Sequence, residues 1–495
     1  MVQEVSFLLS NRKYAPSSAV HFATYFCPPA NMSSEAPATD DATAPAPAKP
    51  RRRRVIRKKR SAGPLKSDIP ESISQNPALL NAISSSLPRD YEFEIAKTIH
   101  RINQAKAHHV ALQLPEGLLM YACSIGDILK AFTEPGCCER VSILGDVAYG
   151  ACCVSDLDAK ALGCEFLVHY GHSCLVPITE TVVKCLYVLV EIRIDVQHLV
   201  DCFCATCDEG TQVFVMGTVQ FRAAVVEAAK ILNERNRPAM VPQAKPLSPG
   251  EVLGCTAPAD LCDCAIERAC KEDKCESSGG CGDDNCCQTD VTAAAATAAT
   301  ATNANVSTEE EKVMLFVADG RFHLEAAMIS NPTLRALRYD PYNKVLTEEK
   351  YETEKMKSIR NKSIQRAMDP SAKTFGIILG TLGRQGNPAI LGQIRKLLQK
   401  HNKSSFIVLL SEIFPQKLDM FPNVDVWVQI ACPRLSVDWG HHFTKPVLNP
   451  YELNVALGEV EYQEVYPMDY YRKGSGVWTN YHDENRVRKL VNEGP

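Results

Sequence analysis

The stretch "KTFGIILGTLGRQGNP", residues 373–388, combines a buried-strand pattern, a glycine-rich turn and the start of a helix. Asn387 can cap that helix, and Pro388 suits its first turn. An amphipathic helical pattern follows, and then "SSFIVLLSE" (404–412) and "VDVWVQIACP" (424–433), both typical of buried strands. Strands that alternate with helices predict parallel α/β units, so the fold class that we expect is α/β.

This pattern occurs three times along the chain. Strand-and-turn segments at "HVALQLPEG" (109–117) and "TQVFVMGTVQ" (211–220) precede the one at 373–388. Glycine turns fall at Gly117, Gly217 and Gly380, and cysteine loops, each read as ending an equivalent strand, fall at Cys152, Cys255 and Cys432. The repeat predicts three similar α/β domains with parallel-type sheets, spanning residues 76–198, 199–348 and 349–495.

Two segments depart from the repeat. Residues 1–75 are expected to form a disordered tail, in which 1–31 resemble an upstream extension before the natural-looking start at Met32. Its basic run "KPRRRRVIRKKR" (49–60) fits a nuclear-localisation or nucleic-acid patch, but the low-complexity segment before it favours a solvated tail. The second departure is a disordered, cysteine-rich insert at about 259–311, which interrupts the second unit.

Composition limits the classes of function. The chain has 495 residues, a net charge of −4 that implies no charged partner, and no apolar run long enough for a membrane helix. We therefore expect a cytoplasmic protein that binds neither membrane nor nucleic acid. Without a secretory signal, the 21 cysteines do not indicate a disulfide scaffold. In a reducing compartment they indicate a metal, a cluster or simple packing.

Several groups of cysteines compete for a chemical role. "CFCATC" contains a single CxxC pair, Cys204 and Cys207, which is weak evidence for half a zinc site or a redox pair. The doublet Cys137 and Cys138 fits loop filling. The insert offers dense thiols without zinc-finger spacing, suited to adventitious zinc or copper(I) binding: Cys262, Cys264, Cys270, Cys275, Cys281, Cys286 and Cys287.

The spread-out trio Cys152, Cys255 and Cys432 is the fourth group. Parallel α/β units place the loops after their strands at one sheet edge, so three units can bring three distant cysteines to one point. Structural zinc prefers four ligands, whereas three thiolates on a [4Fe–4S] cluster leave one iron open to a small molecule. The spacing alone leaves packing of buried free cysteines open as well.

Longer motifs carry a family resemblance over roughly residues 85–475, the insert excepted. They are "LQLPEGLL", "GDVAYGACCVSD", "FLVHYGHSCL", "PLSPGEVLGCTAP", "DGRFHLEAAMISNP", "GIILGTLGRQG", "LLSEIFPQKL", "VWVQIACPRLSVDWG" and "YPMDYY". Together they resemble the first-subunit type of the diphthamide-forming enzymes. The cysteine-rich insert and the amino-terminal extension depart from the plain family pattern.

The resemblance implies a fold and a chemistry. It implies three domains around a pseudo-threefold centre, each giving one ligand to a [4Fe–4S] cluster: Cys152, Cys255 and Cys432. It further implies an atypical radical S-adenosylmethionine enzyme, a 2-(3-amino-3-carboxypropyl)histidine synthase. Such an enzyme transfers a 3-amino-3-carboxypropyl group to the imidazole C2 of a histidine in translation elongation factor 2, the first step of diphthamide biosynthesis. The implied partners are a paralogous second subunit in a heterodimer and a small iron-binding electron donor.

Polar residues near the expected cluster edge are candidates for binding S-adenosylmethionine. They are Asp146, Arg321, His323 and Arg434, for each of which a structural salt bridge is an equally good reading. "GTLGRQG" (380–386) lacks the GK[ST] ending of a P-loop and suits a close backbone approach to the cofactor.

Two other classes of function remain open from the residues. One is a thiol-rich metal-binding or scaffold protein that acts through the insert. The other is an α/β nucleotide-binding enzyme whose cysteines only pack.

Overall fold

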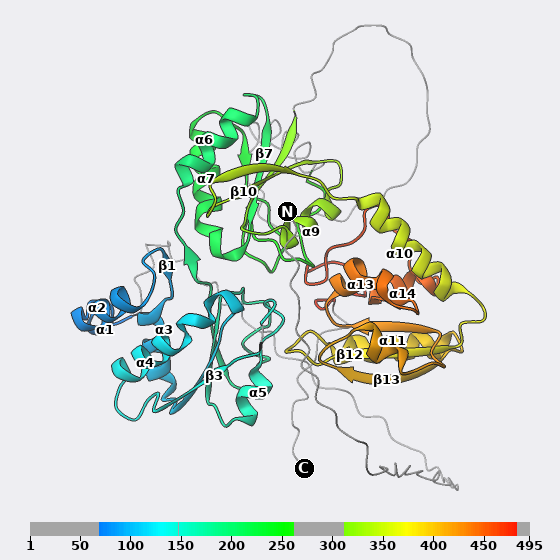
Figure 1. Ribbon diagram of the computed structural model, residues 1–495, viewed down its shortest axis with the longest axis horizontal. Helices are drawn as coiled ribbons and strands as arrows, with labels where there is room; N and C mark the ends of the chain where they lie inside the picture. Colours follow the sequence, from blue (N-terminus) through cyan, green and yellow to red (C-terminus); the bar gives the residue numbers. More distant parts are fainter. Residues whose placement is uncertain (1–68, 147, 262–310, 483–495) are drawn as a thin grey trace, which may run out of the picture. The chain divides into compact units, whose positions relative to one another are not determined.

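The computed structural model describes residues 69–146, 148–261 and 311–482 (Figure 1). The basic run at 49–60 and nearly all of the cysteine-rich insert lie outside the described residues. Ordered structure begins slightly before Asn76, with helix α1 at Glu71–Ser74. Asn76 then caps α2 (Pro77–Ser86), accepting hydrogen bonds from the backbone N–H groups of Ala78 and Leu79.

The first sheet consists of four parallel strands in the order β3-β2-β4-β5. Helices α3 and α4 cover the core side of β2 and β4, where Ile99, Ile125 and Leu129 are fully buried. The elements are α3 (Ile95–Ala105), β2 (His109–Gln113), η1 (Glu116–Tyr121), α4 (Ala122–Phe132), β3 (Arg140–Leu144), α5 (Asp156–Ala161), β4 (Phe166–Tyr170) and β5 (Lys184–Val188). A short pair, β1 (Tyr91–Glu92) and β6 (Glu191–Ile192), lies outside this sheet.

The second sheet has the order β11-β10-β9-β7-β8, and only β11 is antiparallel to its neighbour. The insert separates β8 from β9, so it interrupts one sheet, as the sequence predicts. The elements are α6 (Val196–Thr206), β7 (Gln212–Gly217), η2 (Val219–Phe221), α7 (Arg222–Glu234), β8 (Ala239–Met240), β9 (Lys312–Val317), α9 (Phe322–Ser330), β10 (Arg335–Asp340) and β11 (Val345–Glu349).

The third sheet consists of parallel strands in the order β13-β12-β14-β15. Asn387 caps α11 with Pro388 at its first position, as the sequence predicts. The elements are α10 (Thr353–Met368), β12 (Thr374–Gly380), α11 (Pro388–Lys400), β13 (Ser404–Leu410), α12 (Pro415–Asp419), β14 (Val426–Ile430), α13 (Pro433–Trp439), η3 (Gly440–His442), β15 (Val447–Leu448) and α14 (Pro450–Ala456).

All three sheets share one strand order. In each, the first strand along the chain lies between the second and the third, and the fourth follows the third. The internal repeat read from the sequence is therefore real at the level of topology. The domain limits at residues 198 and 348, and the pseudo-threefold arrangement, stay predictions.

The apolar run "LYVLVEI" (186–192) predicts one strand, but Val190 adopts a left-handed backbone (φ 56°), and β5 and β6 form on either side of it. The prediction that the three cysteine loops end equivalent strands is also wrong. Cys152 and Cys255 follow the second strands, β3 and β8, of their sheets, whereas Cys432 follows the third strand, β14. Both kinds of loop leave the carboxyl edge of a parallel sheet, so they can still meet.

Candidate functional site

The structure brings Cys152, Cys255 and Cys432 into one electrostatically connected group. The charges of Cys432 and Cys255 raise the pKa of Cys152, and Cys432 raises that of Cys255. Tyr471, almost fully buried, is influenced by all three thiols. None of the three forms a disulfide. Thiols more than 100 residues apart in sequence thus meet at one place, as the repeat suggested.

Burial contributes to a raised pKa of all three thiols. It raises the pKa of Cys255 to about 12 and raises the pKa of Cys432. For Cys152, a hydrogen bond with Cys153 is the main cause of a raised pKa, and burial adds to it. Buried thiols without a nearby cation stay protonated, whereas a coordinated metal deprotonates them and offsets the cost of burial. Three convergent free thiols therefore suit a soft, cationic iron–sulfur group.

The Cys152–Cys153 doublet has two different environments. Cys153 is almost fully buried and receives a hydrogen bond from Gln385 Nε2 at 3.4 Å. Hydrogen bonds from Cys152 and from backbone N–H groups lower the pKa of Cys153 to about 7. Cys255 and Cys432 both raise the pKa of Cys152, and Cys153 in turn raises the pKa of Cys432, so both members of the doublet lie close to the other two cysteines. The hydrogen bond from Gln385 to Cys153 distinguishes the two thiols and leaves Cys152 as the candidate ligand.

Hydrogen bonds from two different sheets fix the backbone of the Cys152–Cys153 doublet. Gln113, the last residue of β2, donates to the Cys153 carbonyl at 2.8 Å and accepts from the Ser155 N–H at 3.1 Å. From the third sheet, the Arg384 N–H donates to the Cys152 carbonyl at 2.8 Å. The loop "GTLGRQG" thus makes a close backbone approach, but its partner in the structure is the cysteine loop.

Arg434 lies beside the thiols but is fully engaged by protein groups. Its guanidinium forms ion pairs with Glu325 and Asp438, and it donates to the carbonyls of Gly254 (3.2 Å) and Phe322 (2.8 Å). It also stacks 4.3 Å from the ring centroid of Phe322. The structural salt-bridge reading therefore describes Arg434, which ties the Cys255 loop to α9 and α13 and lowers the pKa of Cys255 and Cys432.

Arg321 and Asp146 are two more of the predicted binding residues. Arg321 pairs with Glu349 at 3.2 Å and donates to the Lys350 carbonyl, so it too is a salt-bridge residue. Asp146 is exposed in the loop after β3. Neither has a described contact with a cysteine.

His323, the fourth predicted residue, lines a pocket of about 390 Å³, which we call the histidine pocket. This pocket is formed by loops from the first two sheets, and among its lining residues are Gly150, His172, Ser173, Thr218, Leu253 and His323. Gly150 and Leu253 each precede a cysteine of the trio by two residues, and a Cβ on Gly150 would lie 3.8 Å from Cys152 Sγ. The histidine pocket therefore adjoins the thiols.

Several buried polar atoms in this pocket have no partner among the described residues. They are His172 Nδ1, His323 Nδ1 and Thr218 Oγ1. Burial lowers the pKa of His172 and of His323 to about 4, so both rings are neutral at physiological pH and can donate or accept a hydrogen bond. Unsatisfied buried polar groups around a cavity are typical of a ligand site. His172 and Thr218 were not singled out from the sequence, although they lie just after strands β4 and β7.

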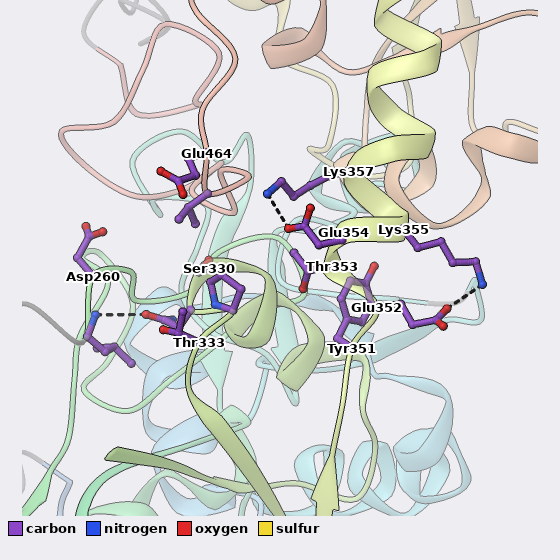
Figure 2. Close-up of a pocket in the computed structure, with 14 residues that line it drawn as sticks. Asp260, Ser330, Thr333, Tyr351, Glu352, Thr353, Glu354, Lys355, Lys357 and Glu464 are labelled. Atoms are coloured by element: carbon purple, nitrogen blue, oxygen red, sulfur yellow. Dashed lines mark hydrogen bonds and ion pairs between the residues drawn. The ribbon is translucent and has the colours of Figure 1, made fainter. Parts of the chain in front are cut away.

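The largest described pocket, about 780 Å³, lies elsewhere (Figure 2). It opens between Asp260, the end of α9 and the start of α10. Its charged side chains largely pair with one another, as in Glu352–Lys355 and Glu354–Lys357. It contains no thiol, so its size does not make it the chemical centre.

Several other described cysteines pack in or against the cores of the sheets. Cys202, Cys204 and Cys207 pack around α6 in the core of the second sheet, and Cys138 packs in the core of the first. Within the described ranges, no three His, Cys, Asp or Glu side chains converge as the ligands of a single metal ion. The ligands of a cluster bind different irons and are spread more widely than those of one ion.

The fold and the thiol group define an α/β protein suited to holding an iron–sulfur cluster among three loops. Comparisons with known proteins agree. The family described as "Putative diphthamide synthesis protein" matches residues 114–467, more than half of the chain. The chain belongs to this family.

Named relatives and solved structures are similar over most of their length. The chain is 46% identical over 413 residues to a 2-(3-amino-3-carboxypropyl)histidine synthase subunit 1 of Dictyostelium discoideum, covering 83% of this chain and 78% of that one. The protein of the same name in Homo sapiens is 46% identical over 427 residues, covering 86% and 85%. Crystal structures of Dph2 from Pyrococcus horikoshii, one of them with a 4Fe-4S cluster, match with a TM-score of 0.54 at 25% and 26% identity, covering 76% of this chain and 93% of theirs.

Proposed function

We propose that this chain is one subunit of the enzyme that transfers a 3-amino-3-carboxypropyl group from S-adenosylmethionine to the imidazole C2 of a histidine in translation elongation factor 2. The convergence of Cys152, Cys255 and Cys432 carries the proposal, because three free, partly buried thiols from distant loops match the ligand set of a cluster with one open iron. Relatives named as subunit 1 of this synthase support it.

In this proposal Cys152, Cys255 and Cys432 hold a [4Fe–4S] cluster that, when bound, supplies an electron for cleavage of the bond between sulfur and the methionine γ-carbon. Arg434 compensates the thiolate charge from one side without leaving its own carboxylate partners. Gln113 and Arg384 fix the backbone of the cysteine doublet. These residues would position the cluster, and the cluster itself would supply the electron transfer.

The histidine pocket is the proposed site for S-adenosylmethionine. It adjoins Cys152, and the neutral rings of His172 and His323 offer hydrogen bonds without repelling a cationic sulfonium. Of the residues expected to bind this co-substrate, His323 keeps that role in the proposal. Arg321 and Arg434 are assigned to salt bridges instead. The role of Asp146 in binding S-adenosylmethionine stays a prediction.

The proposed partners are a paralogous second subunit, a small iron-binding electron donor and elongation factor 2, and the proposed location is the cytoplasm. The printed name "subunit 1" of the relatives supports the second subunit. Within the described residues, no helix is both long and apolar enough to cross a bilayer.

Anaerobic turnover tests the proposal directly. The chain, its paralogous subunit and elongation factor 2 are incubated with a chemical reductant and S-adenosylmethionine labelled in the aminocarboxypropyl group. Label on a histidine of the factor, with methylthioadenosine released, is the expected result. Alanine at Cys152, Cys255 or Cys432 should remove the cluster absorbance and the iron, whereas Cys123→Ser, at an exposed cysteine of α4, should change neither. Full iron content in all three alanine variants would reject the ligand assignment.

Two competing functions have separate outcomes. Deletion of residues 262–307 should leave iron binding and turnover intact, and loss of function in that deletion with the trio dispensable would favour a thiol-rich scaffold protein instead. A colourless, iron-free protein prepared under strict anaerobiosis would favour an α/β nucleotide-binding enzyme with packing cysteines.

A further inference from the structure

Strand β13, "SSFIVLL", forms one edge of the third sheet and pairs only with β12 (Figure 1). Its backbone groups alternate between the β12 side and the open side. The Ser404 N–H donates to Lys373, and the Leu410 carbonyl accepts from Thr381, so residues of even number face the ladder. The N–H and C=O groups of Ser405, Ile407 and Leu409 therefore point away from β12, toward an unoccupied strand position.

The side chains of this edge are apolar on both faces of the sheet. On one face Phe406 packs against Trp427 and Phe421, yet Phe406 and Phe421 remain more than one-third exposed. On the other face, toward α11, Ile407 is 37% exposed and Leu409 is 63% exposed. An exposed, uncharged, seven-residue edge is a site for pairing with another chain unless something covers it.

The other sheet edges in the described part of the chain are protected. Charged residues lie on β3 (Arg140), β5 (Lys184) and β11 (Glu348 and Glu349). The remaining edge strands, β8 and β15, are two residues long and each follows a proline. Charge, proline and short length are the usual means of preventing edge pairing. Among the described edges, β13 alone lacks all of them, although β3 and β8 occupy the same place in their sheets.

We propose that β13 is the docking edge for the second subunit, whose own sheet edge adds to β13 and continues the third sheet. This inference rests on the proposed function, in which the chain acts with a partner subunit. Apolar side chains on both faces require an occupant with apolar layers on both faces, which a sheet edge supplies and a single peptide does not. A stable interface also needs about 800 Å² per partner, which is more than one strand's backbone provides. Exposed Phe414 and Met420 around α12 extend the apolar surface.

Two substitutions test the edge without touching the thiol group. Leu409→Lys places a charge on the most exposed of the large apolar positions of β13 and should weaken the heterodimer at least tenfold. Ser405→Pro removes one open-side N–H donor and leaves the ladder with β12, because that N–H does not face β12; a proline is tolerated there. The matched control is Val345→Lys, at a 46% exposed residue of edge strand β11, which should leave assembly unchanged.

The measurement uses the full chain co-expressed with its affinity-tagged paralogous subunit, with complex mass determined by light scattering. Residue-resolved hydrogen exchange adds a second readout. The amides of Ser405, Ile407 and Leu409 should exchange at least tenfold more slowly in the complex, whereas those of Phe406 and Val408 should be slow in both states. Circular dichroism and melting curves check that each variant is folded.

Three outcomes would overturn the docking proposal. The first is a folded Leu409→Lys variant that forms the heterodimer as tightly as the wild type. The second is protection of the open-side amides in the monomeric chain alone, which would mean that the chain covers its own edge. A homodimer broken by Leu409→Lys while the heterodimer survives would assign the edge to a second copy. Iron content and release of methylthioadenosine are followed in the same samples, so that a failed interface is distinguishable from a failed proposed function.

Discussion

Arg384, in the loop between β12 and α11, forms a two-pronged ion pair with Asp156 at the start of α5. Its Nε and one terminal guanidinium nitrogen lie 2.8 and 2.6 Å from the two carboxylate oxygens. Asp156 is fully buried, and its carboxylate also accepts from the Val182 N–H at 2.7 Å. The same Arg384 donates its backbone N–H to Cys152. One residue thus connects a buried carboxylate to the candidate cluster loop.

Replacement of Arg384 by alanine should therefore destabilise the protein by about 3–5 kcal/mol, because a buried carboxylate loses its cation. Chemical denaturation measures the loss, and iron content after anaerobic reconstitution should fall as well. The control is Arg235→Ala, which removes an exposed pair with Asp201 and should have no measurable effect. Adding Asp156→Asn to Arg384→Ala should recover part of the stability, and no recovery would contradict an uncompensated charge as the cause.

Gly383 allows the close approach between the same two loops. Its φ is +55°, and a Cβ there would lie 2.5 Å from Cys153 Cα. Gly383→Ala should cost about 1–3 kcal/mol and lower the iron content, since the loop at 380–386 must move away from the doublet. Gly392 lies in α11 with no atom near its would-be Cβ, so Gly392→Ala should be neutral or stabilising by up to about 1 kcal/mol. Equal effects of the two substitutions would show that the contact with Cys153 is unimportant.

Local signals made much of the fold predictable. The cap at Asn387, Pro388 in the first turn of α11 and the buried runs of β12 and β14 are encoded within a few residues, and all are present. From the sequence, Pro433 could end the buried run before it or open a helix, and in the structure it opens helix α13 with Cys432 at the N-cap. A proline fits both situations, so the dipeptide alone could not distinguish them.

Long-range contacts explain the site residues that the sequence placed poorly. Arg434 looked available for a substrate carboxylate because its partner Glu325 is 109 residues away and its other acceptors, Gly254 and Phe322, are backbone carbonyls. His172 was overlooked because the histidine pocket forms only when loops from two sheets meet. The trio of cysteines was predictable because the repeat places each near a carboxyl edge, even though Cys432 follows a different strand.

The cysteine doublet gives a sharp prediction about ligand choice. Cys152→Ala should abolish the cluster, whereas Cys153→Ala should retain iron close to the wild-type amount, because Cys153 is turned toward Gln385. Iron analysis and the visible absorbance of the reconstituted proteins measure this difference. Retention of the cluster in Cys152→Ala together with its loss in Cys153→Ala would transfer the ligand role to the second thiol.

The buried histidines predict acid sensitivity of the metal-free chain. Burial lowers the pKa of His172 and of His323 from 6.5 to about 4, and burial also lowers that of His169. The unfolded chain therefore takes up protons below about pH 6.5, while the folded chain does so only near pH 4. Stability should be constant for these groups above pH 6.5 and should fall as the pH drops toward 4, by up to about 3 kcal/mol for each of His172 and His323.

Urea denaturation at intervals between pH 7 and 4 measures this slope. His323→Gln should reduce it by removing one of the buried groups, and the variant should lose less stability on acidification than the wild type. His441→Gln, at an exposed histidine after α13, is the matched control and should keep the wild-type slope. The same slope in His323→Gln as in the wild type would mean that folding does not lower the pKa of His323, and burial in the pocket would then not be what keeps this ring neutral below pH 6.5.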